Sequence, residues 1–482
     1  MLAVINVLGS MLMLFSVTYL LPIVTSLVYA DGLLVDFIYA AIGCLAAGAG
    51  LVLATRKHRR ELRSRDGFLL VTLGWIFMSA IATVPLLIAL PGLTFTDAFF
   101  ETMSGLSTTG ATVLTGLDTM APSLNLWRHA LVWYGGMGII VLVVAILPML
   151  GVGGMQLYKA ETPGPIKDEK LTPRITQTAR ALWIVYFLIT VACILSLRVA
   201  GMGWFDAICH AFAAMGLGGF STYDASVGHF DSPAIEAVLI VFMLIAAMNF
   251  ARHFIAWQQK SLRTYATDIE AKAMLSIIGI STVGVSLYIW LHGVYPSFWS
   301  ALRHTAFNLV SIATDCGFVS QDYASWPMFA PMFILMLSCY CANTGSTGGG
   351  IKMFRTLVLF RQAQRELFLL VHPSAVTPVK IGGQVVANKI VFAVLAFVVL
   401  YFGTVVTLTF MLLASGLDFI SSFSAVIACI NNAGPGLGIV GPASNYQGLT
   451  DFQTWVCTLA MLLGRLEIFS MLVLFTPTFW RK

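Results

Sequence analysis

The sequence has few charged residues. Asp, Glu, Lys and Arg make up 10% of its 482 residues, whereas a soluble globular chain carries about 25%. Hydrophobic residues make up 58%, and the mean hydropathy is +0.87. This composition excludes a cytosolic enzyme, a disordered protein and a nucleic-acid-binding protein. It indicates a chain whose partner is membrane lipid.

Paired metal ligands are also missing. The eight cysteines are scattered through apolar stretches, with no CxxC pair and no histidine at a zinc-ligand spacing. Neither a zinc site nor a disulfide framework is therefore indicated. His210 and His304 have no second ligand nearby, so we expect them to pack or to form hydrogen bonds. We expect no resident cofactor and no signal peptide, since the apolar start runs on too far without a cleavage site.

Ten apolar runs predict ten membrane spans, because a helix needs about 20 apolar residues to cross a bilayer. The run at 327–360 is too long and too rich in glycine for one continuous helix. The runs lie at residues 2–29, 33–54, 67–90, 125–149, 177–199, 234–257, 273–292, 327–360, 388–414 and 452–477. The predicted fold class is an all-α polytopic membrane protein.

Lys and Arg gather in loops on one predicted side of the membrane. The loop 55–65 is the most basic, and basic loops stay in the cytoplasm. Counting spans from that loop places the basic loops near 151–176, 258–272 and 361–387 on the same side. The opposite segments 220–233, 318–326 and 438–451 contain no Lys or Arg. Ten spans then predict that both termini are cytoplasmic.

Four short stretches on the predicted outer side are too short to cross a bilayer, at about 10–14 residues each. Each ends in a small polar turn with a central glycine. The central glycines are Gly110, Gly219, Gly317 and Gly434, which are 109 (219−110), 98 (317−219) and 117 (434−317) residues apart. Irregular backbone at membrane depth must line an aqueous cavity or be buried in protein. Four turns on one side therefore predict a common axis, with four unrelated packing loops as the alternative.

Such turns suit a dehydrated cation. Backbone carbonyls can replace the water shell of an ion, and the preceding short helix would point its partly negative C-terminus at the axis. The turns contain hydroxyls and amides but no Lys or Arg and no ring of carboxylates. A large monovalent cation is therefore the predicted cargo.

Several motifs resemble the Trk/Ktr/HKT superfamily, and in particular the membrane subunit of the bacterial Trk potassium-uptake system (TrkH/TrkG type). The motifs are TTGAT at 108–112, GGMGIIVLVVAILPMLGVGGMQLY at 135–158, PGPIKD at 163–168, GGFST at 218–222, DSP at 231–233, GSTGGGIK at 345–352, NNAGPGLG at 431–438, GRLEIF at 464–469 and LFTPTFWRK at 474–482. The resemblance implies four M1–pore helix–M2 repeats around a pseudo-fourfold pore, after two extra N-terminal transmembrane helices. The corresponding division of the chain is 1–66 for the N-terminal helices, 67–175, 176–270, 271–384 with the gate loop, and 385–482.

The resemblance also implies potassium uptake across the bacterial inner membrane. It implies a homodimer and a cytoplasmic TrkA-type regulatory subunit that binds nucleotide and NAD. The implied potassium-binding selectivity filter comprises Thr108, Thr109, Gly110, Leu217, Gly218, Gly219, Asp315, Cys316, Gly317, Asn432, Ala433 and Gly434. Asp315-Cys316 departs from the family, which commonly has Thr-Ala there, and Cys341 to Thr344 replace a typical Gly-Gly-Cys-Ala.

A second set of residues predicts a gate below the filter. Residues 343–350 read NTGSTGGG, and glycine costs about 1 kcal/mol relative to alanine in a helix. A broken loop within the membrane is predicted, with a cytoplasmic turn between helices as the alternative. The predicted gate residues are Asn343, Thr344, Gly345, Ser346, Thr347, Gly348, Gly349, Gly350, Lys352 and Arg465.

Three charged residues need their own interpretation. A charge inside a span is by default a functional candidate, and the resemblance places Arg465 in the pore as a barrier to cations. Pairing of Arg465 with Glu467 is disfavoured, because residues i and i+2 do not share a helix face. Lys352 either anchors the loop at the interface or simply follows the positive-inside rule. Asp315 either concentrates cations at the filter, or titrates and couples protons, or it caps local backbone amides.

Two other function classes predict different sequence features. A proton- or sodium-coupled secondary transporter (symporter) would show inverted repeats, whereas these repeats look parallel. A membrane-embedded enzyme would need converging His, Asp or Glu within the spans, and these are nearly absent. The predicted docking surface for a soluble partner is formed by the loops 156–176 and 361–387.

Overall fold

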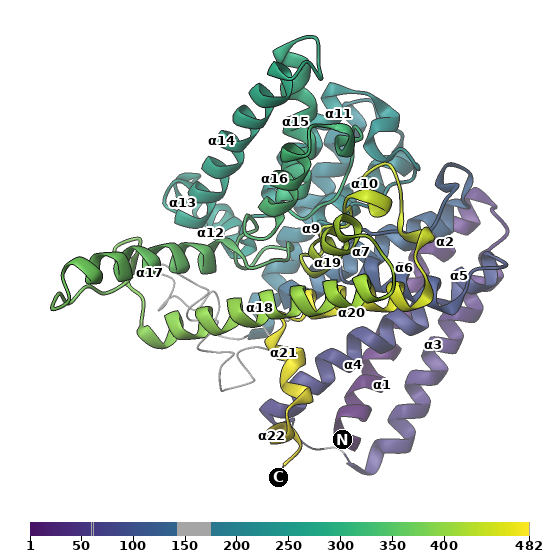
Figure 1. Ribbon diagram of the computed structural model, residues 1–482. Coiled ribbons are helices and arrows are strands. Elements are labelled where there is room, and N and C mark those ends of the chain that lie inside the picture. Colours follow the sequence, from purple (N-terminus) through teal and green to yellow (C-terminus); the bar gives the residue numbers. More distant parts are fainter. Residues whose placement is uncertain (59, 61, 142–174, 482) are drawn as a thin grey trace.

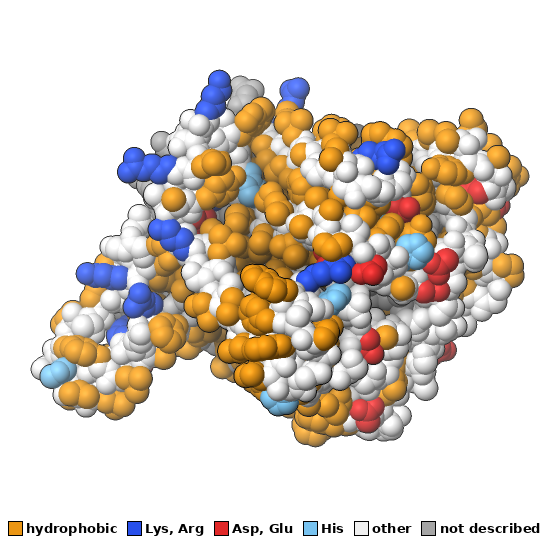
Figure 2. Space-filling model, turned by 90° about the horizontal axis from the view of Figure 1, so that it is seen from above, with side chains coloured by type: hydrophobic (Ala, Val, Ile, Leu, Met, Phe, Trp, Pro, Cys, Tyr) orange, Lys and Arg blue, Asp and Glu red, His pale blue; other side chains and the backbone are white. Residues whose placement is uncertain are grey.

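The computed structural model describes residues 1–58, 60, 62–141 and 175–481. Six helices of this part are long and apolar enough to cross a membrane, and two bent helix pairs raise the number to eight. Hydrophobic side chains are exposed over much of the surface (Figure 2), as expected where lipid surrounds the protein. The chain is an all-helical, multi-pass membrane protein. The described strands, β1 (Lys380–Ile381) and β2 (Gln384–Val385), form a short hairpin.

An N-terminal layer packs beside the first repeat (Figure 1). It contains α1 (Leu2–Phe15), α2 (Leu20–Tyr29) and α3 (Leu34–Thr55). Helices α1 and α3 cross so closely that a Cβ at Gly9 would lie 2.7 Å from the carbonyl oxygen of Gly48. Tyr19 stacks on Trp127 of the first repeat, with ring centroids 4.4 Å apart. Glycine contacts and aromatic packing thus join the layer together and attach it to the pore repeats.

The rest of the chain repeats one succession four times: a first helix, a short helix and a second helix. The first helices are α4 (Ser64–Ala82) with α5 (Val84–Ala89), α9 (Ile175–Val199), α14 (Ile269–Leu291) and α18 (Asn388–Ala414). The short helices are α6 (Phe95–Leu106), α10 (Trp204–Gly216), α15 (Phe298–Ala313) and α19 (Phe419–Ile430). The second helices begin with α7 (Pro122–Val141), α11 (Pro233–Ala246), α16 (Phe329–Ser338) and α20 (Asp451–Arg465).

The four repeats close into a ring through one recurring contact. The second helix of each repeat packs on the short helix of the next repeat: α7 on α10, α11 on α15, α16 on α19, and α20 back on α6. The last contact joins segments from opposite ends of the chain. The repeats therefore surround one axis.

Two predicted spans are wrong as continuous helices. The run 234–257 bends by 96° between α11 and α12 (Phe250–Gln259), and the run 452–477 bends by 107° after α20, before α21 (Phe469–Leu472). At the first break Asn249 caps α12 by accepting the N–H of Ala251 at 2.8 Å. The run 327–360 is interrupted as expected, since α16 ends at Ser338 and α17 (Met353–Val371) follows only after a loop.

The remaining predicted spans fit less directly. α16 has 10 residues and is too short to cross a membrane alone, and the run 125–149 continues past α7 outside the described residues. Residues 151–174 of the loop predicted at 151–176 also lie outside them, and α9 begins at Ile175. Two further short helices are α13 (Arg263–Ala266), which precedes α14, and α22 (Pro477–Trp480), near the C-terminus. Both termini lie at the same end of the molecule (Figure 1).

Candidate functional site

The four short helices end in the same backbone motif. A left-handed residue ends each short helix, at the C-cap of α10 and one residue after the C-cap of the other three. The next N–H bonds to the carbonyl five residues before it, as in a Schellman motif. The left-handed residues are Thr108 (φ 58°), Leu217 (φ 55°), Asp315 (φ 65°) and Asn432 (φ 58°). The closing bonds run from Thr109 to Ser104 (2.8 Å), Gly218 to Ala213 (3.0 Å), Cys316 to Ser311 (2.8 Å) and Ala433 to Ala428 (2.8 Å). Glycine, the usual residue in this conformation, occupies none of the four positions.

The central glycine stands two residues further on and serves a different purpose. A Cβ at Gly110 would lie 2.4 Å from the nitrogen of Gly219, and one at Gly219 would lie 2.3 Å from the carbonyl carbon of Gly317. A Cβ at Gly317 would lie 2.5 Å from the carbonyl oxygen of Ala433. One at Gly434 would lie 2.7 Å from the carbonyl oxygen of Thr109. Each turn therefore touches the next, and the fourth touches the first.

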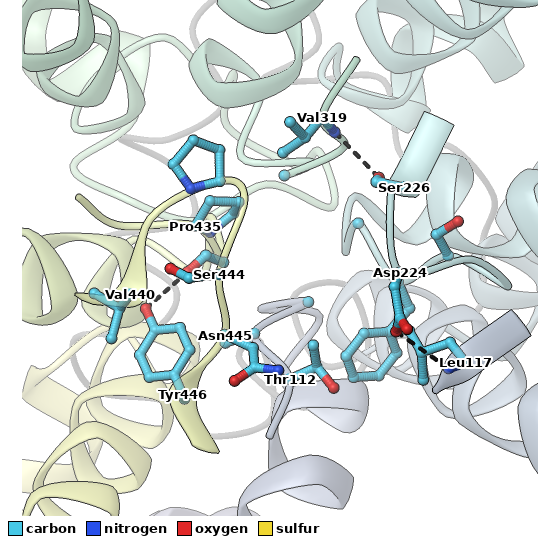
Figure 3. Close-up of a pocket in the computed structure, with 18 of the residues that line it drawn as sticks. Thr112, Leu117, Asp224, Ser226, Val319, Pro435, Val440, Ser444, Asn445 and Tyr446 are labelled. Atoms are coloured by element: carbon cyan, nitrogen blue, oxygen red, sulfur yellow. Dashed lines mark hydrogen bonds between the residues drawn. The ribbon is translucent and has the colours of Figure 1, made fainter. Parts of the chain in front are cut away.

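This closed ring forms the floor of a cavity of about 80 Å³ that all four repeats line (Figure 3). Hydrogen bonds between repeats hold its mouth. Asp224 accepts the N–H groups of Gly116 (2.9 Å) and Leu117 (3.1 Å), Ser226 accepts that of Val319 (3.2 Å), and the Tyr446 N–H donates to the carbonyl of Thr112 (2.9 Å). The mouth is thus built from hydrogen-bonded loops of different repeats.

A polar side chain of each short helix forms a hydrogen bond to the extended segment that follows its turn. In three repeats it stands nine residues before the central glycine: Glu101 (110−101), His210 (219−210) and Asn308 (317−308). Glu101 accepts from Thr112, His210 Nε2 lies 3.0 Å from Ser221 Oγ, and Asn308 accepts the N–H of Ser320 at 3.1 Å. In the fourth repeat Ser424 accepts the N–H of Leu437 at 2.8 Å. His210 is therefore a hydrogen-bonding residue, and the described residues contain no cluster of His, Cys, Asp or Glu able to hold a metal.

The loop 343–350 lies directly below the ring. Its glycines pack against two of the turns, since a Cβ at Gly348 would lie 3.2 Å from Asp315 Oδ2 and one at Gly349 would lie 2.1 Å from the Asn431 carbonyl oxygen. Thr347 donates its hydroxyl to the carbonyl of Met215 at 3.1 Å, at the end of α10. Eight of the ten predicted gate residues are buried, and Gly345 and Gly350 are half-buried.

Arg465 joins this loop to the first repeat. The buried guanidinium at the end of α20 donates to the carbonyl oxygens of Thr347 (2.8 Å) and Gly135 (2.9 Å). It also lies over the ring of Trp75, 5.8 Å from the centroid. Arg465 forms no ion pair with Glu467, as the spacing predicts. A positive charge therefore stands beneath the ring, held by backbone carbonyls of two repeats.

Asp315 contacts the loop from above. Its carboxylate is fully buried and accepts the N–H of Gly349 at 3.1 Å, while Oδ1 has no hydrogen-bond partner among the described residues. Asp315 thus caps an amide, but one from the loop 34 residues away and not a local one.

Lys352 is buried within the protein. Its Nζ lies 3.4 Å from Glu467 Oε1, and Arg355 donates to the other oxygen at 2.7 Å. Glu467 and Ile468 both have positive φ, 54° and 51°, at the break between α20 and α21. These charges link the start of α17 to the break in the fourth repeat.

The structure brings the twelve predicted filter residues into one ring and places the loop 343–350 and Arg465 beneath it, whereas Lys352 pairs with Glu467. Sequence reasoning missed the bent second helices and the ion pair of Glu101 with Arg128, at 2.8 Å. Signals for both existed. Asn249 is a strong helix cap within the run 234–257, and Arg128 is a charge within the predicted span 125–149.

The family model described as "TrkH: Cation transport protein" matches residues 35–482. The Trk system potassium uptake protein TrkH of Escherichia coli (strain K12) is 45% identical, and the match covers 100% of this chain and 99% of that protein. The TrkG protein of the same organism is 41% identical over 98% of this chain and 97% of its own length. The crystal structure of the potassium transporter TrkH from Vibrio parahaemolyticus superimposes with a TM-score of 0.92 at 44% identity, covering 100% of this chain and 99% of that one.

Proposed function

Since the chain belongs to the TrkH family, the membrane subunits of Trk potassium-uptake systems, we propose that it conducts potassium into the cell through the ring of four turns. The chain is a multi-pass inner-membrane transport protein and not an enzyme. The single observation that carries the proposal is the closed contact of Gly110, Gly219, Gly317 and Gly434. Four helix ends with one geometry provide equivalent backbone groups around one axis, which a monovalent ion stripped of water requires.

The proposed gate is the loop 343–350 with Arg465. Thr347 of the loop donates its hydroxyl to the Met215 carbonyl at the end of α10, and Gly349 of the loop donates its N–H to Asp315, just after α15. The Arg465 guanidinium adds a positive charge near the axis, in a region where charge is weakly screened. In this proposal conduction requires the loop to leave the axis and Arg465 to release the Thr347 carbonyl.

The partners of the chain follow from the family and are proposed as well. We place both termini in the cytoplasm, with a second copy of the chain in a homodimer. A TrkA-type cytoplasmic subunit that binds nucleotide and NAD would control the gate through the inner surface, where α17 and the hairpin β1–β2 project away from the pore repeats (Figure 1). The transported ion is K⁺, and no resident cofactor is proposed.

Coupled symport is the second candidate function. The observation that favours it is the buried carboxylate of Asp315, which has an unpartnered oxygen between the ring and the loop. A proton or a sodium ion bound there would move with the loop.

Liposomes containing the purified protein separate the two candidates. Rubidium uptake is measured with and without an imposed proton gradient, and with sodium present or absent. A conducting pore predicts uptake that follows the rubidium gradient alone. Uptake that needs a proton or sodium gradient supports symport, and liposomes that take up no rubidium under any of these conditions contradict potassium transport by this chain.

A further inference from the structure

The wall of the ring cavity contains a buried ion pair. Arg128 of α7 donates its Nε to Glu101 Oε1 of α6 at 2.8 Å, and each side chain is only 1% exposed. Removing one partner of such a pair leaves an uncompensated buried charge.

Arg128 connects the first two turns. Its other nitrogens donate to Asn125 Oδ1 (3.0 Å), to the Thr112 hydroxyl (3.3 Å) and to the Ser221 carbonyl (3.4 Å). The guanidinium also lies 4.4 Å from the centroid of the Phe220 ring, next to Gly219. One cationic side chain thus bridges the segments that follow Gly110 and Gly219, and it lines the cavity itself.

Glu101 holds the same region from the opposite side. Its carboxylate accepts the Thr112 hydroxyl (3.0 Å) and the Val113 N–H (3.1 Å) in addition to Arg128. In the three other repeats the equivalent segment is held by His210, Asn308 and Ser424, none of which is a carboxylate. Bracing a turn therefore does not require a carboxylate, and the charge at Glu101 needs another explanation.

The explanation lies in the position of Arg128. A guanidinium stays protonated in proteins, so Arg128 presents a fixed positive charge to the cavity of a cation path. Repulsion between unit charges is several times stronger near protein than in bulk water. The negative charge of Glu101 offsets that repulsion while Arg128 keeps its three other hydrogen bonds.

We propose that Glu101 is a positioning residue whose charge neutralises Arg128 at the wall of the filter, so that the affinity of the ring for its cation depends on this charge balance. The inference rests on the proposed function. It goes beyond that function by assigning an affinity-setting role to two residues outside the four turns.

Cation binding to the detergent-solubilised protein provides the first measurement. The thermal midpoint is followed as KCl replaces choline chloride, because an ion that binds the folded state stabilises it. Half-saturation of rubidium uptake in liposomes is the second. Glu101→Gln is expected to raise the half-saturating concentration about tenfold in both. The double variant Glu101→Gln/Arg128→Met, which is again charge-balanced, and Glu101→Asp, which keeps the charge, are expected to stay near the wild-type value.

A matched control breaks an ion pair elsewhere. Glu236 and Arg303 are 2.7 Å apart, and neither lines the cavity. Glu236→Gln is expected to leave cation affinity unchanged, even where it lowers the thermal midpoint without potassium.

Each result of these measurements either supports or overturns the role of Glu101. Wild-type affinity in Glu101→Gln, or a double variant no better than the single one, overturns the proposal. If Glu101→Gln yields no folded protein, a raised half-saturating concentration in either charge-balanced variant overturns it, and wild-type values in both support it. Normal cation binding without rubidium uptake by the wild type would reject the proposed transport function and leave the binding comparison intact.

Discussion

Two regions of the repeats follow opposite rules: the outer half, which is the four turns at the ends of the short helices, and the inner half, which is the second helices with their breaks. In the outer half one backbone motif occurs four times, with Thr108, Leu217, Asp315 and Asn432 in the same left-handed conformation. In the inner half the repeats differ: α11 and α12 meet at 96°, α20 and the helix after it meet at 107°, and a loop separates α16 from α17. Symmetry is kept where four groups would share one ion. It is lost where a single loop occupies the axis.

Disrupting the contacts between the four turns should have the largest effect on rubidium uptake. Gly219→Ala places a Cβ 2.3 Å from the backbone of the third turn. Overpacking against rigid backbone costs about 1–3 kcal/mol, so rubidium uptake should fall by up to about 100-fold. Gly279→Ala on α14 is the control, because an added Cβ there would have no neighbouring atom within 4 Å. This variant should take up rubidium at the wild-type rate. A folded Gly219→Ala protein with wild-type uptake would refute the close-packed ring.

Removing the positive charge of Arg465 should raise rubidium flux, which is the opposite effect. Arg465→Ala deletes the guanidinium that holds the carbonyls of Thr347 and Gly135. Rubidium flux should rise about tenfold, since both a restraint on the loop and a repulsive charge disappear. Arg198→Ala, at the outer end of α9, should leave flux unchanged. Unaltered or lower flux at normal protein levels would argue against Arg465 as a barrier.

Asp315 connects the two halves, so its effect should be intermediate. Asp315→Asn keeps a group able to accept the Gly349 N–H but loses the negative charge. The half-saturating potassium concentration should rise about fivefold. Asp36→Asn, in the N-terminal layer, serves as the control. An unchanged concentration dependence would show that Asp315 only holds the loop.

The ion cluster around Glu467 should matter least for flux and most for stability. Glu467→Gln leaves Lys352 and Arg355 without their shared carboxylate. Flux should change by no more than about twofold, while the free energy of unfolding falls by about 2 kcal/mol, a value discounted because Glu467 is partly exposed. Thermal unfolding measures the second effect. A thermal midpoint equal to that of the wild type would mean that the cluster does not stabilise the inner half.

The outer half could be predicted from the sequence because local patterns determine it. Apolar runs give the spans, and one glycine per repeat marks where neighbouring turns touch. The inner half could be predicted only in part. The break at 343–350 is visible as glycine content, but the breaks at Asn249 and Glu467 depend on contacts between repeats, such as the Phe250 N–H donating to the Gly345 carbonyl at 3.1 Å.

The residues that carry charge were the hardest to interpret. Sequence spacing correctly separated Arg465 from Glu467, but it could not supply the partners of either residue. For Lys352, which follows the glycine run by two residues, the sequence left two interpretations open: an anchor at the membrane interface, or simple placement by the positive-inside rule. Its burial depends on Glu467, more than 100 residues away, and no local pattern records that contact.

One continuous polypeptide builds all four corners of the ring, whereas a ring of identical subunits changes every corner with each substitution. Here a single codon alters one corner and leaves three intact. The bracing side chains show the result, with a carboxylate, an imidazole, an amide and a hydroxyl at the four corners. In a single-chain ring, therefore, one corner can change its chemistry while the backbone geometry of the other three is kept.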